Sequence, residues 1–414
     1  MATWLQYALA PAMSDIEPTV QGPLWPPPRR TAPRWAGGPS ALVVGLVALL
    51  VAVLAVAITA SHEASGYFLF SPGTAPVITT STKCQLSGGE LALPDGTPCV
   101  RLVLPQGKVH NVDGELLMVD VEVGQAGPLD WLRYKLGLLG SSRQMVPEAE
   151  YAGSTPTSEL GCQDTEEMVS ANEDAALAAL AQLHYRVDEE ALGVQVDAVF
   201  AGTPAWTAGV KCDDVISAVD GKPVQTAEQL TALLAPMQPG STVTLTDHRA
   251  GAKRATQVKI VVASPPASAL AQGFTGHSYI GVEVETRVKP VLPFQVSVDA
   301  AGIGGPSAGL AFTLAILDAL SNGKLTGGHR IAATGTIDPD GDVGDVGGVQ
   351  EKTAAVEKAG AQVFFVPQVE YAVAKSVAGN KLQVIPVTTL GQVLEILRQR
   401  FGGGLPAPSG SGAA

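Results

Sequence analysis

One uninterrupted apolar run near the N-terminus constrains this chain more than any other feature. Residues 41–60 (ALVVGLVALLVAVLAVAITA) contain no charged side chain, and about 20 apolar residues are enough to cross a bilayer as a helix. We therefore predict a transmembrane helix over 39–61, preceded by a disordered, proline-rich cytoplasmic tail over 1–38. A cleaved signal peptide is the alternative, although its apolar core is normally only about 7–15 residues long.

Basic residues flank this run on one side only and so indicate its orientation. Arg29, Arg30 and Arg34 precede it, whereas the first Lys or Arg after it is Lys83. The positive-inside rule keeps such an N-terminus in the cytoplasm. We predict a single-pass protein of the cell membrane whose remaining chain, after residue 61, is extracytoplasmic.

Composition narrows the class of protein. The length of 414 residues suggests about three folding units at roughly 150 residues each. Hydrophobic residues make up 46% and charged residues 16%, which excludes wholesale disorder. The net charge is −13, whereas a general nucleic-acid binder carries an excess of basic residues. We therefore expect no nucleic-acid partner.

The four cysteines suit an oxidising compartment. Cys84 and Cys99 close a short loop, where a disulfide would persist outside the cytoplasm. Cys162 and Cys212 could form a second pair, although nothing in the sequence brings them together. Unpaired buried thiols are the alternative for both pairs. No spacing resembles a zinc site, and we predict no metal or other cofactor.

Two patterns organise the chain after the membrane segment. Residues 62–185 alternate short apolar runs with turn residues, which predicts a strand-rich juxtamembrane region without a recognisable chemical motif, and a helix from about Glu166 to Leu183 ends it. Residues 186–263 then resemble a PDZ domain of the bacterial protease-associated type. The resemblance rests on Leu192-Gly193-Val194, on the turn Gly202-Thr-Pro-Ala205 and on a stretch that ends Val-Asp-Gly-Lys-Pro-Val224.

A PDZ resemblance implies a peptide-binding function. Such domains add an extended peptide as an extra strand and hold its terminal carboxylate on loop amides. We therefore predict a peptide-binding groove along the strand at Val194, with the carboxylate near Leu192 and Gly193. A small α/β unit that merely packs against its neighbours is the alternative.

The segment around Ser307 carries a candidate nucleophile. Residues 294–299 alternate as a strand, and the glycine-rich run 302–305 leads through Pro306 into an apolar helix. Ser307 then lies in the first helical turn, where free amides can stabilise an anion. Gly305-Pro-Ser-Ala-Gly309 also fits the elbow of α/β hydrolases, but that mechanism needs a later acid and then a histidine. Only His329 follows Ser307, so a different base is needed.

A lysine is the natural base in Ser-Lys enzymes. Lys352 lies on the apolar stripe of a helical run, three residues after Val349 and four before Val356, whereas Lys358 faces elsewhere. A desolvated ammonium loses proton affinity and can be neutral near pH 7. A lysine that keeps its charged end in water is the alternative.

Residues 272–402 resemble the proteolytic domain of Lon-type peptidases. Gly-Pro-Ser-Ala-Gly matches their nucleophile motif, and the stretch from Thr334 to Lys352 matches their base motif without a gap. The resemblance implies Ser307 as nucleophile, Lys352 as base, Thr334 as the hydroxyl that orients the lysine, and backbone amides at Ser307 and Ala308 for the oxyanion. Gly304 replaces the acidic residue that many Lon enzymes carry at this position.

Together these features predict an α/β multidomain protein: one transmembrane helix, a strand-rich region, a PDZ domain, a Lon-type α+β domain and a flexible tail over 403–414. No Gly-x-x-x-x-Gly-Lys-Ser/Thr motif occurs, so no ATP use is expected. The predicted function is an ATP-independent, membrane-anchored serine endopeptidase, as in the PDZ-containing Lon-like proteases of bacteria. Its partners would be protein or peptide substrates, with a homo-oligomer left open. The alternative is a PDZ scaffold with an inactive Lon-type domain.

Overall fold

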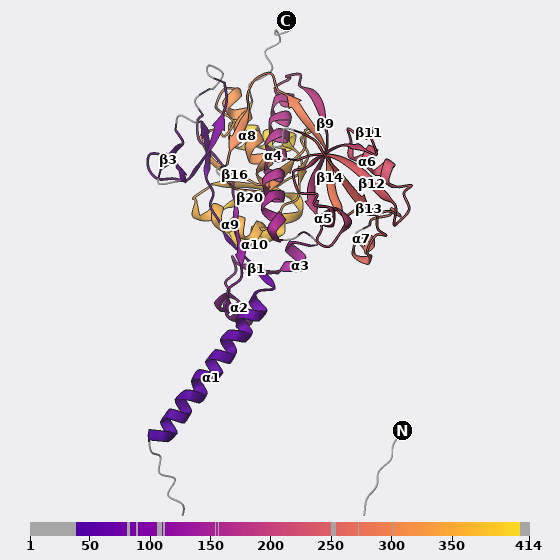
Figure 1. Ribbon diagram of the computed structural model, residues 1–414. Helices are drawn as coiled ribbons and strands as arrows, with labels where there is room; N and C mark the ends of the chain where they lie inside the picture. Colours follow the sequence, from indigo (N-terminus) through magenta and orange to yellow (C-terminus); the bar gives the residue numbers. More distant parts are fainter. Residues whose placement is uncertain are drawn as a thin grey trace, which may run out of the picture. The chain divides into compact units, whose positions relative to one another are not determined.

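The computed structural model describes residues 39–80, 83–87, 90–105, 110, 112–153, 155, 157–249, 254–271, 273–300 and 302–405. By its contacts the chain divides into two compact units, residues 1–56 and 57–414, whose elements Figure 1 labels. The predicted cytoplasmic tail (1–38) and the predicted C-terminal tail from residue 406 onward lie outside the described residues.

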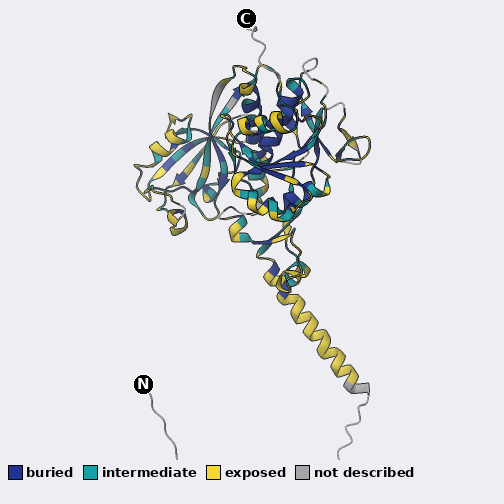
Figure 2. Cartoon of the chain, turned by 180° about the vertical axis from the view of Figure 1, so that it is seen from behind, coloured by how far each residue is buried: buried dark blue, intermediate teal, exposed yellow. Residues whose placement is uncertain are grey.

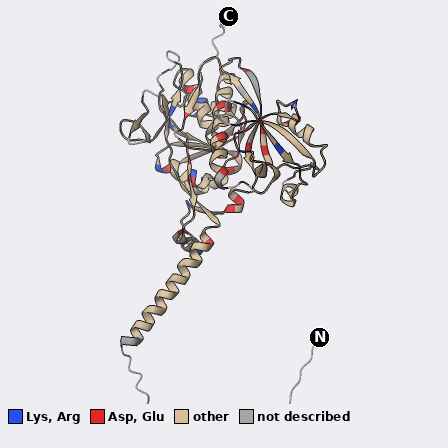
Figure 3. Cartoon of the chain, viewed as in Figure 1, with Lys and Arg blue, Asp and Glu red and all other residues tan. Residues whose placement is uncertain are grey.

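A long apolar helix opens the described part of the chain. Helix α1 (Pro39–Ala64) has 26 residues, about 39 Å at a rise of roughly 1.5 Å per residue. From Leu42 to Ala64 it is long and apolar enough to cross a membrane. Its large side chains are exposed (Figure 2, yellow) and almost none is charged (Figure 3, tan). A helix that is apolar all round and not covered by protein is typical of a membrane span.

The largest sheet has seven strands and joins two distant segments of the chain. In sheet order they are β15 (Ser297–Asp299), β5 (Cys99–Val103), β2 (Val77–Thr80), β6 (Glu115–Leu117), β16 (Arg330–Ala333), β19 (Val363–Pro367) and β20 (Gln383–Val387). Three of them come from the segment 62–185 that the sequence analysis had separated from 272–402. Alternating side chains show that a strand is half-buried but not which distant strand it pairs with, so the sequence pattern did not reveal this shared sheet.

Helices cover both faces of this sheet. Ile331 and Ala333 pack into one core and Ala332 into another, because successive side chains of a strand point to opposite faces. The first core also holds α4 (Thr157–Gln182), α8 (Gly309–Leu320) and α11 (Leu390–Arg400). The second holds α9 (Val349–Lys358) and α10 (Tyr371–Ala378). Helix α8, which follows Ser307, and helix α9, which carries Lys352, thus lie against opposite faces.

A small antiparallel sheet follows α1 directly. Its strands, in the order β7-β1-β8, are β7 (Val121–Gln125), β1 (Tyr67–Pro72) and β8 (Gln144–Pro147). Helix α2 (Pro128–Lys135) lies in the connection from β7 to β8, and α3 (Glu148–Tyr151) follows β8.

A third sheet forms the PDZ-like part of the chain. Its path is β13 (Thr256–Val261), β12 (Thr242–His248), β10 (Val215–Val219), β9 (Asp188–Val199) and β14 (Val282–Val291), with β11 (Lys222–Pro223) paired to β10. Ala205 of α5 (Pro204–Ala208) and Leu230 of α6 (Ala227–Leu234) complete its core, and α7 (Ala267–Ala271) follows. Strand β14 lies beyond the boundary predicted at residue 263, and its last residue, Val291, pairs with the first residue of β9, Asp188.

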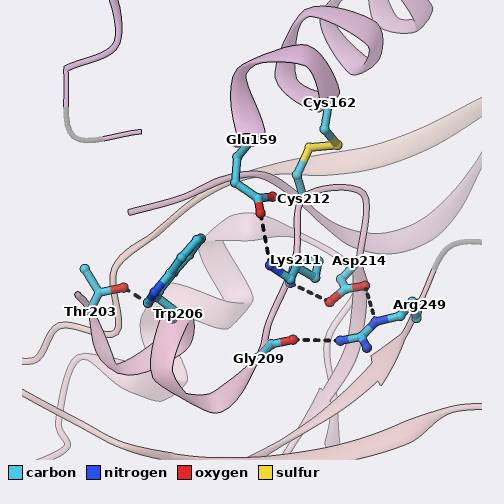
Figure 4. A network of polar contacts seen from close by, with 9 residues as sticks. All are labelled: Glu159, Cys162, Thr203, Trp206, Gly209, Lys211, Cys212, Asp214 and Arg249. Atoms are coloured by element: carbon cyan, nitrogen blue, oxygen red, sulfur yellow. Dashed lines mark hydrogen bonds and ion pairs between the residues drawn. A yellow bond between two sulfur atoms is a disulfide. The ribbon is translucent and has the colours of Figure 1, made fainter. Parts of the chain in front are cut away.

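Short elements and two disulfides complete the structure. The short pairs are β3 (Gln85–Ser87) with β4 (Glu90–Ala92) and β17 (Thr336–Ile337) with β18 (Val343–Gly344), and the 3-10 turns are η1 (Pro306–Ala308) and η2 (Gln368–Glu370). One disulfide joins Cys84 to Cys99. The other joins Cys162 of α4 to Cys212, just before β10 (Figure 4).

Candidate active site

The loop before Ser307 is held by helix α4. Gly305 caps the turn η1 with φ 86°, a left-handed conformation that glycine adopts without strain. Its N–H donates to the backbone carbonyl of Asp164 over 2.7 Å. Pro306 follows at the first position of η1, where a missing N–H costs nothing. Ser307 is thereby presented in the first turn ahead of α8.

Gly304 lies so close to α4 that no side chain fits there. A Cβ atom built on Gly304 would lie 2.6 Å from the Cβ of Asp164. Many of the Lon enzymes that this segment resembles have an acidic residue at this position. In this chain the space next to the nucleophile loop is instead occupied by an acidic residue of α4.

Thr334 connects the nucleophile loop to the candidate base. It follows β16, is fully buried, and its N–H donates to the carbonyl of Phe365 over 3.0 Å. Its Oγ1 lies 3.1 Å from the carbonyl oxygen of Ser307 and 3.4 Å from Nζ of Lys352. The structure therefore brings Ser307, Thr334 and Lys352 together, although 45 residues separate the serine from the lysine in the sequence.

Lys352 is buried in the first turns of α9. Only 3% of the residue is exposed. Helix α9 begins after Gly348, which has φ 65° and lies so close to Val121 of β7 that a Cβ would be 2.7 Å from its Cγ2. This close approach of α9 to β7 leaves the lysine stem within the protein.

Burial lowers the proton affinity of Lys352, so that its neutral form becomes available near neutral pH. It lowers the pKa of Lys352 to about 8, because a desolvated ammonium is disfavoured, and the carboxylates of Glu370, Asp120 and Glu351 only partly offset this. Burial likewise raises the pKa of Glu351. A sizeable fraction of Lys352 is then neutral near pH 7–8.

A cavity of about 890 Å³ opens onto both Ser307 and Lys352. Ser307 and Lys352 line it together with Phe70 of β1, Asp120 before β7, and Asp164 of α4. Asp120 is fixed by the N–H and hydroxyl of Thr74 at 2.6 and 2.8 Å. The arrangement offers a nucleophile, a poorly solvated amine and room for an extended chain.

The walls of this cavity include residues that the sequence analysis missed. Phe70, Asp120 and Asp164 all come from the segment 62–185, in which no motif was recognised. Their only sequence signal is the period-two pattern of the strands and the helical pattern of α4. Neither pattern shows that these elements lie next to Ser307.

The predicted peptide groove at Val194 does not fit the strand pairing. Val194 pairs with Ile216 of β10 on one side and with Thr286 of β14 on the other. Gly193 likewise pairs with Arg287, and Leu192 precedes it in the same strand. Both edges of β9 are occupied here, so no added strand can bind along it. The strand that covers this edge, β14, lies beyond the domain boundary predicted at residue 263.

A second cavity, of about 730 Å³, lies next to β14 instead. Leu230, Thr231 and Leu234 of α6 line one side, and the other side includes the segment 279–282, which leads into β14. Strand β14 is the last strand of its sheet. The start of α6 contacts β14 directly, because the N–H of Ala227 donates to Oγ1 of Thr286 over 2.9 Å, and the apolar cavity lies beside the first residues of the strand.

Comparisons with known proteins identify the two larger parts of the chain. Residues 171–260 match the PDZ domain family, and residues 291–400 match the Lon protease (S16) C-terminal proteolytic domain. The chain therefore contains a PDZ domain and a Lon-type proteolytic domain, which confirms the resemblances drawn from its motifs.

The similar curated proteins align only with the C-terminal part of this chain. A Lon protease of Malacoplasma penetrans is 36% identical over 101 residues, 24% of this chain and 13% of the relative. A Lon protease of Chloroflexus aggregans is 28% identical over 135 residues, 31% of this chain and 15% of the relative. The aligned part thus spans only 13% and 15% of these relatives' length. A solved PDZ domain of an SdrC-like protein from Listeria monocytogenes is 20% identical and covers 22% of this chain and 86% of that one, with a TM-score of 0.19.

Proposed function

We propose that this chain, which carries a PDZ domain and a Lon-type proteolytic domain, is a membrane-anchored serine endopeptidase that works without ATP. Ser307 is the nucleophile and Lys352 the general base of a catalytic dyad. The observation that carries the proposal is the burial of Lys352, 3% exposed, in the wall of the cavity that Ser307 also lines. A lysine has no structural need to be there, since burying its charge is costly.

The proposed reaction proceeds through a covalent ester on Ser307. Neutral Lys352 takes the proton of the Ser307 hydroxyl as Oγ attacks the peptide carbonyl, and the carbonyl electron pair moves onto oxygen. Backbone amides at Ser307 and Ala308 stabilise this oxyanion, each such donor being worth roughly 3 kcal/mol of barrier. The intermediate collapses, Lys352 gives its proton to the departing amine, and water hydrolyses the resulting ester with Lys352 again as base. Thr334 keeps the ammonium end oriented through its hydroxyl.

Anchoring and compartment are parts of the same proposal. Helix α1 is a candidate membrane span, and the arginines at 29, 30 and 34 before it favour a cytoplasmic N-terminus. The two disulfides suit an oxidising compartment for the part after the span. Extracytoplasmic compartments hold no ATP pool, which agrees with the lack of a phosphate-binding loop motif in the sequence.

The PDZ domain would recruit substrates through the cavity beside β14. A C-terminal tail bound there would place its apolar side chains against Leu230 and Leu234 of α6. This replaces the groove predicted at Val194.

Cleavage of an unfolded protein by the purified full chain, without nucleotide, tests the proposal. We expect Ser307→Ala and Lys352→Ala to abolish cleavage while circular dichroism stays unchanged. Lys381→Ala is the control, because that side chain is 76% exposed and should be dispensable. Cleavage at an undiminished rate by either Ser307→Ala or Lys352→Ala would overturn the dyad.

A further inference from the structure

The connection between β7 and β8 exposes apolar side chains that no part of the described chain covers. We call residues 126–143, which include α2, the α2 loop. Leu129, Leu136 and Leu138 are 66%, 61% and 67% exposed, and Tyr134 is 43% exposed. Such exposure of several leucines in one short segment usually marks an interaction surface.

The α2 loop is tied to the residues that follow α1. Ala126 at its start donates its N–H to the carbonyl of Tyr67 over 2.9 Å, and the side-chain amide of Gln125 donates to the carbonyl of Ser65 over 3.2 Å. The rings of Tyr134 and Tyr67 lie 6.3 Å apart. Residues 65–67 come directly after the apolar helix in the chain, so a membrane that holds α1 must have its surface next to the α2 loop.

The chemistry of the loop matches a membrane surface. Besides its leucines it carries Trp131 and Tyr134, residue types that concentrate at the bilayer–water interface. Arg133, Lys135 and Arg143 outnumber its single acidic residue, Asp130, although the whole chain has a net charge of −13. Basic side chains beside a membrane span are attracted to anionic lipid headgroups.

We propose that the α2 loop binds the interface of the bilayer that α1 spans, with Leu129, Leu136 and Leu138 in the outer acyl region and its basic side chains at the headgroups. The proposal rests on the proposed membrane anchoring of α1 and adds a second membrane contact to it. An interfacial segment of this kind inserts about 5–10 Å below the headgroups, so the small sheet β7-β1-β8 would be held at the membrane.

Fluorescence quenching by lipid tests the proposal on the full chain. All four native cysteines are in disulfides, so a thiol introduced by Leu138→Cys can be labelled alone with a small environment-sensitive fluorophore. The labelled chain is placed in nanodiscs with one chain per disc, made of phosphatidylcholine and phosphatidylglycerol, with and without bromine on the acyl chains. Leu136→Cys is a second test site in the same loop.

Two further labelled variants make each outcome decisive. Leu50→Cys, in the middle of α1, reports the anchor, and Leu86→Cys, which is 70% exposed on β3, reports a solvent position. We expect brominated lipid to quench the labels at residues 50, 136 and 138 but not at 86. Quenching at 50 without quenching at 136 and 138 would overturn the interfacial contact but leave the anchor intact. The same result is expected if the α2 loop binds a protein instead of the membrane. No quenching at 50 would overturn the anchor and the inference with it.

Discussion

The behaviour of Lys352 is decided by its surroundings within a few ångströms. The side chain has lost almost all contact with water, and its Nζ donates to the Thr334 hydroxyl over 3.4 Å. A carboxylate in direct contact would keep the amine protonated, whereas a hydroxyl can accept from the ammonium or donate to the neutral amine. This environment is what allows a lysine to accept a proton from a serine.

The lowered pKa of Lys352 predicts the pH dependence of cleavage. Because the neutral amine is the base and its pKa is about 8, kcat/KM for a short peptide should rise with pH, reach half its maximum near pH 8 and then level off. Initial rates from pH 6 to 10 measure this. A rate that falls as the pH rises from 7 to 9 would contradict the role of Lys352 as base.

Thr334 should affect kcat more than KM, because it orients the base and not the substrate. Thr334→Val removes the hydroxyl with little change in volume, and we expect kcat to fall roughly 10- to 100-fold, the range expected when a hydrogen bond to a charged group is lost. Thr334→Ser, which keeps the hydroxyl, should recover most of the rate. Equal kinetics of the Val and Ser variants would exclude the orienting role.

The sequence predicted some residues of the candidate site and not others, and the reason is physical. Ser307 was found because its glycine-rich loop and following apolar helix are local patterns, and Lys352 because helical spacing places it on an apolar stripe. Asp164 and Asp120 were not found, because their places in the cavity depend on α4 and β7 packing against segments far away in the chain.

Among the secondary-structure elements, α4 links the PDZ domain to the nucleophile loop. Near its start, Cys162 is disulfide-bonded to Cys212, and Glu159 pairs with Lys211 at 3.0 Å (Figure 4). Two residues after Cys162, the carbonyl of Asp164 holds Gly305. The same two turns of helix thus contact both the PDZ domain and the loop that carries Ser307.

The disulfide of α4 should contribute more to stability than the shorter one. It spans 50 residues and the Cys84–Cys99 bridge 15, for which loop-closure entropy gives about 4 and about 3 kcal/mol respectively. Urea unfolding of the two double variants, Cys162→Ala with Cys212→Ala and Cys84→Ala with Cys99→Ala, compares them. We expect the larger loss in the free energy of unfolding for the first pair, and the reverse order would contradict this account.

Sequence patterns identified the PDZ elements better than their pairing. The turn Gly202-Thr-Pro-Ala205, which the sequence analysis singled out, leads into α5 (Pro204–Ala208), because its turn residues are a local signal. The groove was placed on β9 because the strand that covers β9, β14, lies beyond a Ser-Pro-Pro stretch that reads as a linker. A linker signal shows a break in regular structure but not the end of a domain.

At the scale of the whole molecule, the PDZ sheet is an insertion between two segments of the seven-stranded sheet. It begins at Asp188 and ends at Val291, and these two residues pair with each other, so the ends of the insertion lie side by side. Replacing 188–291 by a short glycine linker, with Cys162→Ser to avoid a free thiol, should therefore leave the proteolytic domain folded.

This excision separates recruitment from catalysis. If the PDZ domain delivers substrates, the shortened chain should cleave a short peptide at a similar rate but a protein substrate more slowly. A faster rate on the peptide would indicate that the PDZ domain covers the active site, and an unchanged rate on the protein substrate would contradict recruitment. Thermal melting of the shortened chain is the control for folding.

Covalent labelling of the active serine tests the central claim, a working Ser307–Lys352 dyad, most directly. The full chain, without nucleotide at pH 8, is treated with a serine-reactive phosphonate, and the modified peptide is identified by mass spectrometry. We predict a single adduct on Ser307 that is absent in Ser307→Ala and forms far more slowly in Lys352→Met. A correctly folded chain that takes up no label, or one labelled equally after Ser307→Ala, would contradict the account.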